Sequence, residues 1–150
     1  MTQQKYLKSL QIIFIAIVLG SVSYLAAVVF IKIDDQDTVT NYNDPLLYIV
    51  IAMTTIAIIS SYLIYKFRLP GIKGKESVSE KLNAWRTLFI IRIALMEAAC
   101  LFSVVGLFLT GFDIFLYMAV ALIAFQFINI PTREKIKNDL ELSEEEVGNL

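Results

Sequence analysis

The chain has 150 residues, of which 57% are apolar and 18% charged, and its mean hydropathy is +0.68. Soluble domains are about 45–50% apolar and about 25% charged, so this composition is typical of a one-domain membrane protein. The formal net charge of −1 provides no basic field for nucleic acid, and the lack of histidine excludes imidazole-based metal, haem and catalytic sites. The single cysteine, Cys100, excludes an internal disulfide and any multi-thiolate cluster. We therefore expect no cofactor, no metal and no nucleic-acid partner.

Four apolar segments have, or nearly have, the length of about 20 residues that a transmembrane helix needs. They predict spans at about residues 10–31, 46–65, 88–110 and 114–130. The first is longer than the apolar core of a cleaved signal peptide, which is about 7–15 residues, so we expect it to be retained. The third contains Arg92 and Glu97, whereas the other three contain no charge. The predicted fold is an all-α polytopic membrane protein, an antiparallel bundle of four transmembrane helices.

The basic residues outside these spans fall almost entirely on one side of the membrane. Eleven lie in the N-terminal stub, the connection 66–86 and the tail, whereas the opposite loops contain only Lys32 among the bases. Because positively charged loops stay in the cytoplasm, both termini are predicted to be cytoplasmic, in the cell inner (plasma) membrane. Residues 1–131 would form the transmembrane domain, in contact with the lipid bilayer, and residues 132–150 a charged cytoplasmic tail.

Local signals predict where the second and third helices begin and end. Asp44-Pro45 provides an N-cap and a favourable first helical residue, and Leu69-Pro70-Gly71 is expected to stop the second helix. Ser77 to Glu80 matches a capping box, which predicts that the third helix begins near Val78 and continues to Thr110. About two turns of this helix would project beyond the membrane.

The third and fourth helices are joined by a very short turn. Gly111 suits the end of the third helix and Asp113 the N-cap of the fourth, so we expect the two helices to be antiparallel neighbours. In the tail, residues 136–140 predict a short amphipathic helix, and residues 143–146 match a second capping box in an acidic, solvated end. The acids at 34, 35 and 37 lack the glycine and glutamate of an EF-hand, which favours an ordinary solvated loop.

Glu97 is the main candidate for a functional site. It lies two residues from the midpoint of its span, roughly 3 Å in depth, so its carboxyl group must be paired, hydrated or protonated. Arg92 lies five residues nearer the inner end, where its long side chain can reach the headgroups. A spacing of five places the two side chains about 140° apart, which disfavours a salt bridge within the helix.

Polar residues on the other helices are the expected partners. Gln126 is four residues from the inner end of its span, near the level of Arg92, so we expect an Arg92–Gln126 contact. Glu97 is expected to meet Thr54 or Thr55. The alternative is that these residues only hold helices together. That is the ordinary role of Ser and Thr in spans, and it is the one we expect for six of them: Ser21, Ser23, Thr54, Thr55, Ser60 and Ser61.

The third span also contains small residues at the spacing that allows close helix packing. Ala94–Ala98 and Ala99–Ser103 are pairs of small residues four apart, and the other spans are mostly bulky. We therefore expect the third helix to be the packing centre. Cys100, one turn from Glu97, is expected to act as a small apolar residue because burial in hydrocarbon suppresses thiolate formation.

Two architectural comparisons give no site assignments. Small multidrug-resistance transporters have their glutamate in the first helix, and proteolipid subunits of rotary ATPases have glycine-rich helices; this chain has neither feature. The segments 91–97 with 101–103, and 131–136, resemble uncharacterised small bacterial four-helix inner-membrane proteins. That resemblance implies a membrane location and no chemistry.

Two functional hypotheses follow, and a third is disfavoured. The first is a non-enzymatic accessory subunit of a membrane complex, or a homo-oligomer, packed through the third helix. The alternative is a proton- or cation-coupled transporter or channel that uses Glu97, which would need a dimer or larger ring to enclose a pathway. An enzyme acting on lipid would have to rely on Arg92 and Glu97 without histidine or a metal, so we expect no enzymatic activity.

Overall fold

The computed structural model describes residues 3–32, 42–143 and 146, and the regular structure in these ranges is entirely helical. The helices are α1 (Gln3–Lys32), α2 (Pro45–Lys73), α3 (Val78–Thr110), α4 (Asp113–Ile128) and α5 (Arg133–Leu140). The acidic positions 34, 35 and 37, where we expected a solvated loop, lie outside the described residues. The all-α prediction is confirmed.

Three of the helices, α1, α2 and α3, are long and apolar enough to cross a membrane. The fourth predicted span coincides with α4, which has only 16 residues and qualifies only together with α5, from which it is bent by 74°. Large apolar side chains cover the outside of the long helices: Phe30 is 79% exposed and Phe67 is 73% exposed. Exposed apolar surface of this extent, on helices long and apolar enough to cross a membrane, is typical of a multi-pass membrane protein.

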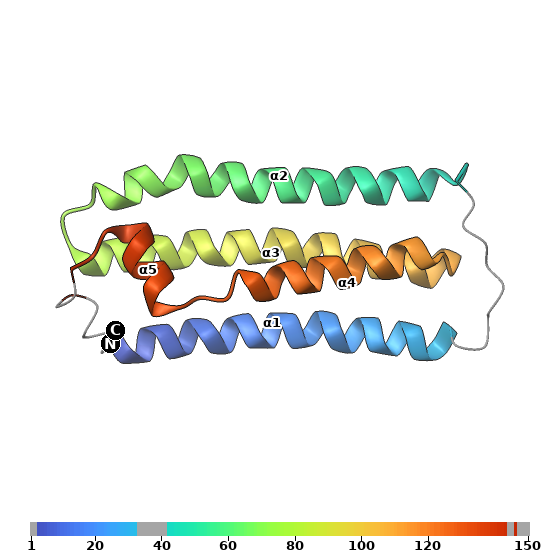
Figure 1. Ribbon diagram of the computed structural model, residues 1–150, viewed down its shortest axis with the longest axis horizontal. Coiled ribbons are helices and arrows are strands. Elements are labelled where there is room, and N and C mark those ends of the chain that lie inside the picture. The colour runs from blue at the N-terminus through green and yellow to red at the C-terminus, as the bar shows by residue number, and fades with distance from the viewer. Residues whose placement is uncertain (1–2, 33–41, 144–145, 147–150) are drawn as a thin grey trace.

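The four longest helices lie lengthwise beside one another, with α3 and α4 between α1 and α2 (Figure 1). α3 contacts each of the other three. In the most apolar 18-residue segment of α3, 44% is buried inside the protein, against 22% for the corresponding segment of α1 and 28% for that of α2. Within the chain, α3 is the packing centre, as its small residues predicted. α5 crosses the bundle where α1 begins, α2 ends and α3 begins (Figure 1). We call this the α5 end of the molecule.

The predicted beginnings of α2 and α3 are confirmed. The side chain of Asp44 accepts a hydrogen bond from the backbone N–H of Leu46 at 2.8 Å, with Pro45 as the first helical residue. The hydroxyl of Ser77 accepts from the backbone N–H of Glu80 at 3.2 Å. Each bond satisfies a backbone donor that has no partner within the helix.

The predicted end of α2 is wrong by a few residues, and the predicted N-cap of α4, Asp113, is wrong by one. α2 continues through Pro70 to Lys73, because Ile72 is buried and the N–H of Gly74 bonds to the carbonyl of Pro70 at 3.2 Å. The N-cap of α4 is Phe112, whose ring is buried and stacks on Phe115 with centroids 6.3 Å apart. Packing of these apolar side chains decides both boundaries.

The turn between α3 and α4 has the conformation that its glycine predicted. Gly111 has a φ of 73°, in the left-handed region where glycine meets no steric penalty, and its N–H bonds to the carbonyl of Leu107 at 2.8 Å. The hydroxyl of Thr110 accepts from the N–H of Phe112 at 3.1 Å. The close turn places α3 and α4 side by side.

The amphipathic helix expected in the tail is α5. Its N-cap, Thr132, accepts from the N–H of Lys135 at 3.2 Å, and Ile136 and Leu140 are fully buried. The second capping box also forms, because Ser143 and Glu146 exchange backbone-to-side-chain bonds of 2.8 and 3.3 Å. α5 is therefore folded onto the other helices and does not project from them.

Candidate functional site

Glu97 joins three helices through one carboxylate oxygen. Its Oε2 accepts a hydrogen bond from the hydroxyl of Ser21 on α1 and another from Nε2 of Gln126 on α4, at 3.4 Å. Ser21 and Gln126 are fully buried, and Glu97 is half-buried. Hydrogen bonds from two neighbouring helices are how an acid within a span is accommodated, since they replace the water that hydrocarbon excludes.

The expected contact of Glu97 with Thr54 or Thr55 is wrong. The hydroxyl of Thr55 donates to the carbonyl of Ile51 in its own helix, at 2.8 Å. The hydroxyl of Thr54 is buried, and within the described residues it has no hydrogen-bond partner. Ser21, which we expected only to hold helices together, is the partner of Glu97 on α1.

The expected Arg92–Gln126 contact is also wrong. Gln126 donates to Glu97, and its own acceptor, Oε1, has no partner among the described residues. Glu97 lies 13 residues before Thr110 and Gln126 lies 13 residues after Asp113, at the two ends of the turn. Counting from this turn, rather than from the inner end of each span, places Gln126 at the level of Glu97.

Arg92 instead lies over the ring of Tyr65 on α2, with Cζ 4.8 Å from the ring centroid. A guanidinium over an aromatic face is a cation–π contact, which stabilises by about 0.5–2 kcal/mol depending on desolvation. The hydroxyl of Tyr65 in turn donates to the carboxylate of Asp139 on α5. Arg92 and Glu97 thus belong to different polar clusters, as their spacing predicted.

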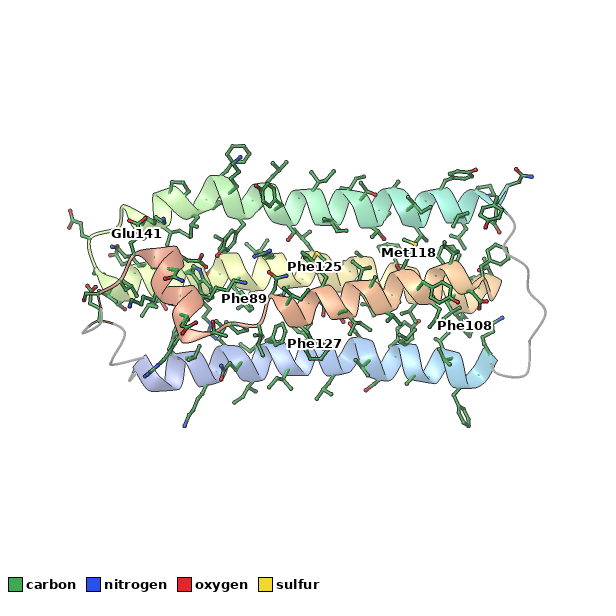
Figure 2. The ribbon with its side chains drawn as sticks, in the orientation of Figure 1. Phe89, Phe108, Met118, Phe125, Phe127 and Glu141 are labelled. Atoms are coloured by element: carbon green, nitrogen blue, oxygen red, sulfur yellow. The ribbon has the colours of Figure 1, made fainter. Side chains whose placement is uncertain are left out.

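Asp139 is the centre of the second cluster. Besides Tyr65, the indole Nε1 of Trp85 on α3 donates to the same oxygen at 3.1 Å, so α5 is bonded to both α2 and α3. Phe89, labelled near α5 in Figure 2, stacks on Trp85 with centroids 5.3 Å apart. Asp139 was not among the site residues predicted from the sequence. A signal was present, because Asp139 lies between the apolar positions 136 and 140 on the stripe that a helix would bury.

Two further bonds hold α5 to the rest of the chain. The ammonium group of Lys73 donates to Glu141 at 2.6 Å, near the end of α5 (Figure 2). The hydrogen bond from Lys73 lowers the pKa of Glu141 below its usual range. The ammonium group of Lys135 donates to the side chain of Asn129 at 3.3 Å, across the bend between α4 and α5.

The small residues of α3 are used in two ways. Gly106 lies under the ring of Phe115, where an added Cβ would be 2.9 Å from Cδ1, so glycine permits the close approach of α3 and α4. Cys100 is buried, and its thiol points to the carbonyl of Ala119 at 3.9 Å, as expected of a small packing residue. Ala94 and Ala98, by contrast, are exposed. In the described ranges, no group of three or more acids and cysteines could hold a metal ion.

No protein-family model, curated protein or solved structure matches this chain. The geometry of its polar clusters therefore has to support any functional assignment.

Proposed function

We propose that this chain is a non-enzymatic integral protein of the cell inner (plasma) membrane, acting as an accessory subunit of a membrane complex or as a homo-oligomer packed through α3. The observation that carries the proposal is the bonding of Glu97 to Ser21 and Gln126. The most deeply placed acid thereby ties α1 and α4 to α3. This use of an intramembrane acid stabilises a bundle and needs no pathway through it.

In this proposal α1, α2, α3 and α4 form an antiparallel four-helix membrane bundle with both termini in the cytoplasm. Support comes from the eleven basic residues that the sequence places on one side and from Trp85, which bonds to Asp139 at the α5 end. At 16 residues α4 spans about 24 Å, somewhat less than the roughly 30 Å hydrocarbon core, so the segment after Ile128 would complete the crossing.

Cysteine labelling tests this topology in a Cys100→Ala background. Tyr42→Cys should react with an impermeant maleimide in intact cells, whereas Glu76→Cys and Asn138→Cys should react only after the membrane is opened. All three positions are exposed, so accessibility within the fold does not bias the comparison. Labelling of position 76 from outside would refute the cytoplasmic location of the α5 end.

The exposed pair Ala94 and Ala98 offers α3 a surface for a second copy or another membrane protein. Native mass measurement in mild detergent would determine the oligomeric state and any retained partner. Ala98→Leu should weaken assembly through α3, whereas Ala52→Leu, at an exposed alanine of α2, should not. A monomer without partners in gentle extraction would contradict the proposal.

The alternative function is proton- or cation-coupled transport through Glu97, and one observation favours it. Oε1 of Gln126 is buried beside Glu97 without a partner among the described residues, and it could accept a hydrogen bond from a water or contact a cation. Flux into proteoliposomes tests this. The unaltered protein should then show a flux, and Glu97→Gln should abolish this flux while assembly is retained, because glutamine cannot exchange a proton. That combination would establish transport.

A further inference from the structure

A groove lies between α2 and α3 on the outside of the molecule near the α5 end. Its volume is about 650 Å³, and it is lined by residues of α2 and α3 together with Lys75, which lies just after the end of α2. Phe67, Leu88 and Ile91 give it an apolar floor, and Arg68 and Lys75 stand along its α2 side. Gly71 lies between these two bases, and a Cβ added there would meet no atom within 4 Å. The groove thus combines an apolar surface, two cations and open space.

The two cations of the groove are weakly engaged. In the described part of the chain Arg68 takes part in no ion pair, and the only one of Lys75 is with Glu80 at 4.0 Å, with 40% of the lysine side chain exposed. Neighbouring bases are occupied elsewhere, since Lys73 bonds to Glu141 at 2.6 Å and Lys66 lies over the ring of Tyr62. Arg68 and Lys75 are therefore the cations left for a ligand at this groove.

We propose that the groove binds an anionic phospholipid, with the headgroup phosphate between Arg68 and Lys75 and an acyl chain along Phe67 and Ile91. Basic pockets between transmembrane helices at the cytoplasmic side recognise anionic headgroups in this way. The apolar floor argues for a lipid, because a free phosphate would use only the cations. The proposal rests on the proposed membrane location of the chain, with the α5 end at the cytoplasmic interface.

Native mass spectrometry of the full chain, purified in mild detergent with equal amounts of phosphatidylglycerol and phosphatidylcholine, tests the site. The unaltered protein should retain phosphatidylglycerol preferentially. Each basic residue near an anionic headgroup contributes about fivefold, so Arg68→Gln with Lys75→Gln should lower retention by about 25-fold. The control pair Lys8→Gln with Lys66→Gln removes the same charge from the same proposed side, outside the groove, and should retain the lipid.

A second pair of variants tests the groove without changing its charge. Gly71→Leu places a side chain in the open space and should lower phosphatidylglycerol retention several-fold. The control is Gly20→Leu on α1, where an added Cβ also meets nothing within 4 Å. Soluble glycerol phosphate in excess should leave the lipid in place, because it lacks the acyl chain that the floor would contact.

Equal retention of the two lipids by the unaltered protein would overturn the lipid site. Equal retention of phosphatidylglycerol by Arg68→Gln/Lys75→Gln and by its control pair would overturn it as well. Displacement by glycerol phosphate would also overturn it in favour of a phosphate site. Alkaline extraction of membranes separates this failure from that of the proposed function. A chain that remains in the membrane pellet without lipid preference refutes the groove alone, whereas a chain released by alkali refutes the membrane protein as well.

Discussion

Gln126 donates its side-chain amide to Glu97 at 3.4 Å, and the two residues lie equally far from the turn that joins α3 to α4. The hairpin therefore sets their level, and Ser21 on α1 completes the cluster from the other side. An acid that would be unfavourable alone in hydrocarbon becomes a link between three helices.

Two substitutions of Glu97 should show how much stability depends on its hydrogen-bond acceptor. Glu97→Gln retains an acceptor for Ser21. Its new amide can donate to Oε1 of Gln126, which has no partner among the described residues, so stability should fall by less than about 1 kcal/mol. Glu97→Ala leaves two buried donors without an acceptor and should cost about 1–3 kcal/mol. Thermal unfolding in detergent measures both. Equal stability of the two variants would contradict a linking role for this carboxyl group.

The bond from Ser21 should be detectable by a double-mutant cycle. Ser21→Ala is expected to lower stability by about 1 kcal/mol in the unaltered chain and by little in a Glu97→Ala background, because the acceptor is then already absent. Ser23→Ala is the matched control, since Ser23 is exposed on the same helix. Additive effects at positions 21 and 97 would show that the two side chains do not interact.

Gly106 should not tolerate even a methyl group. Gly106→Ala places a Cβ 2.9 Å from the fully buried ring of Phe115, and displacing that ring should cost about 1–3 kcal/mol. Gly20→Ala has open space and should be neutral or slightly stabilising, because alanine favours the helix by up to about 1 kcal/mol. Unfolding midpoints of the two variants compare these cases. A destabilised Gly20→Ala together with an unaffected Gly106→Ala would reverse this assignment.

Asp139 should hold α5 in place. Asp139→Ala removes the acceptor of Trp85 and Tyr65, so α5 should detach more often and expose its buried face. In a Cys100→Ala background, the maleimide reaction of Ile136→Cys should therefore become faster. Asn138→Ala, at the exposed neighbouring position, is the control. If the rate is unchanged by Asp139→Ala, packing of Ile136 and Leu140 alone holds the helix.

The contact between Lys73 and Glu141 should weaken in acid. The hydrogen bond from Lys73 lowers the pKa of Glu141, so this carboxyl contributes stability above its unfolded pKa and loses it as the pH falls through the lower folded pKa. The effect should be small because Glu141 is exposed. The unfolding midpoint should exceed that of Glu141→Gln slightly at pH 7, and this difference should shrink as the pH is lowered. A difference that grows in acid would contradict the sign.

The sequence by itself determined that these segments are helices, and it determined where α2 and α3 begin. Apolar length determines a spanning helix without reference to any partner, because backbone groups in hydrocarbon must bond within their own segment. The caps at Asp44, Ser77 and Gly111 are equally local, since each is formed by residues adjacent in the chain. These features were predicted because neighbours in sequence alone produce them.

Only the tertiary structure decided which polar groups meet. α1 and α2 are apolar around most of their circumference, so no periodicity indicated whether Ser21 or Thr54 would face Glu97. The placement of Asp139 against Trp85 depended likewise on the 74° bend between α4 and α5. For helices in lipid, the rotation of each helix about its axis and its position along that axis are set by how its side chains pack against the neighbouring helices. That packing involves residues far apart in the chain.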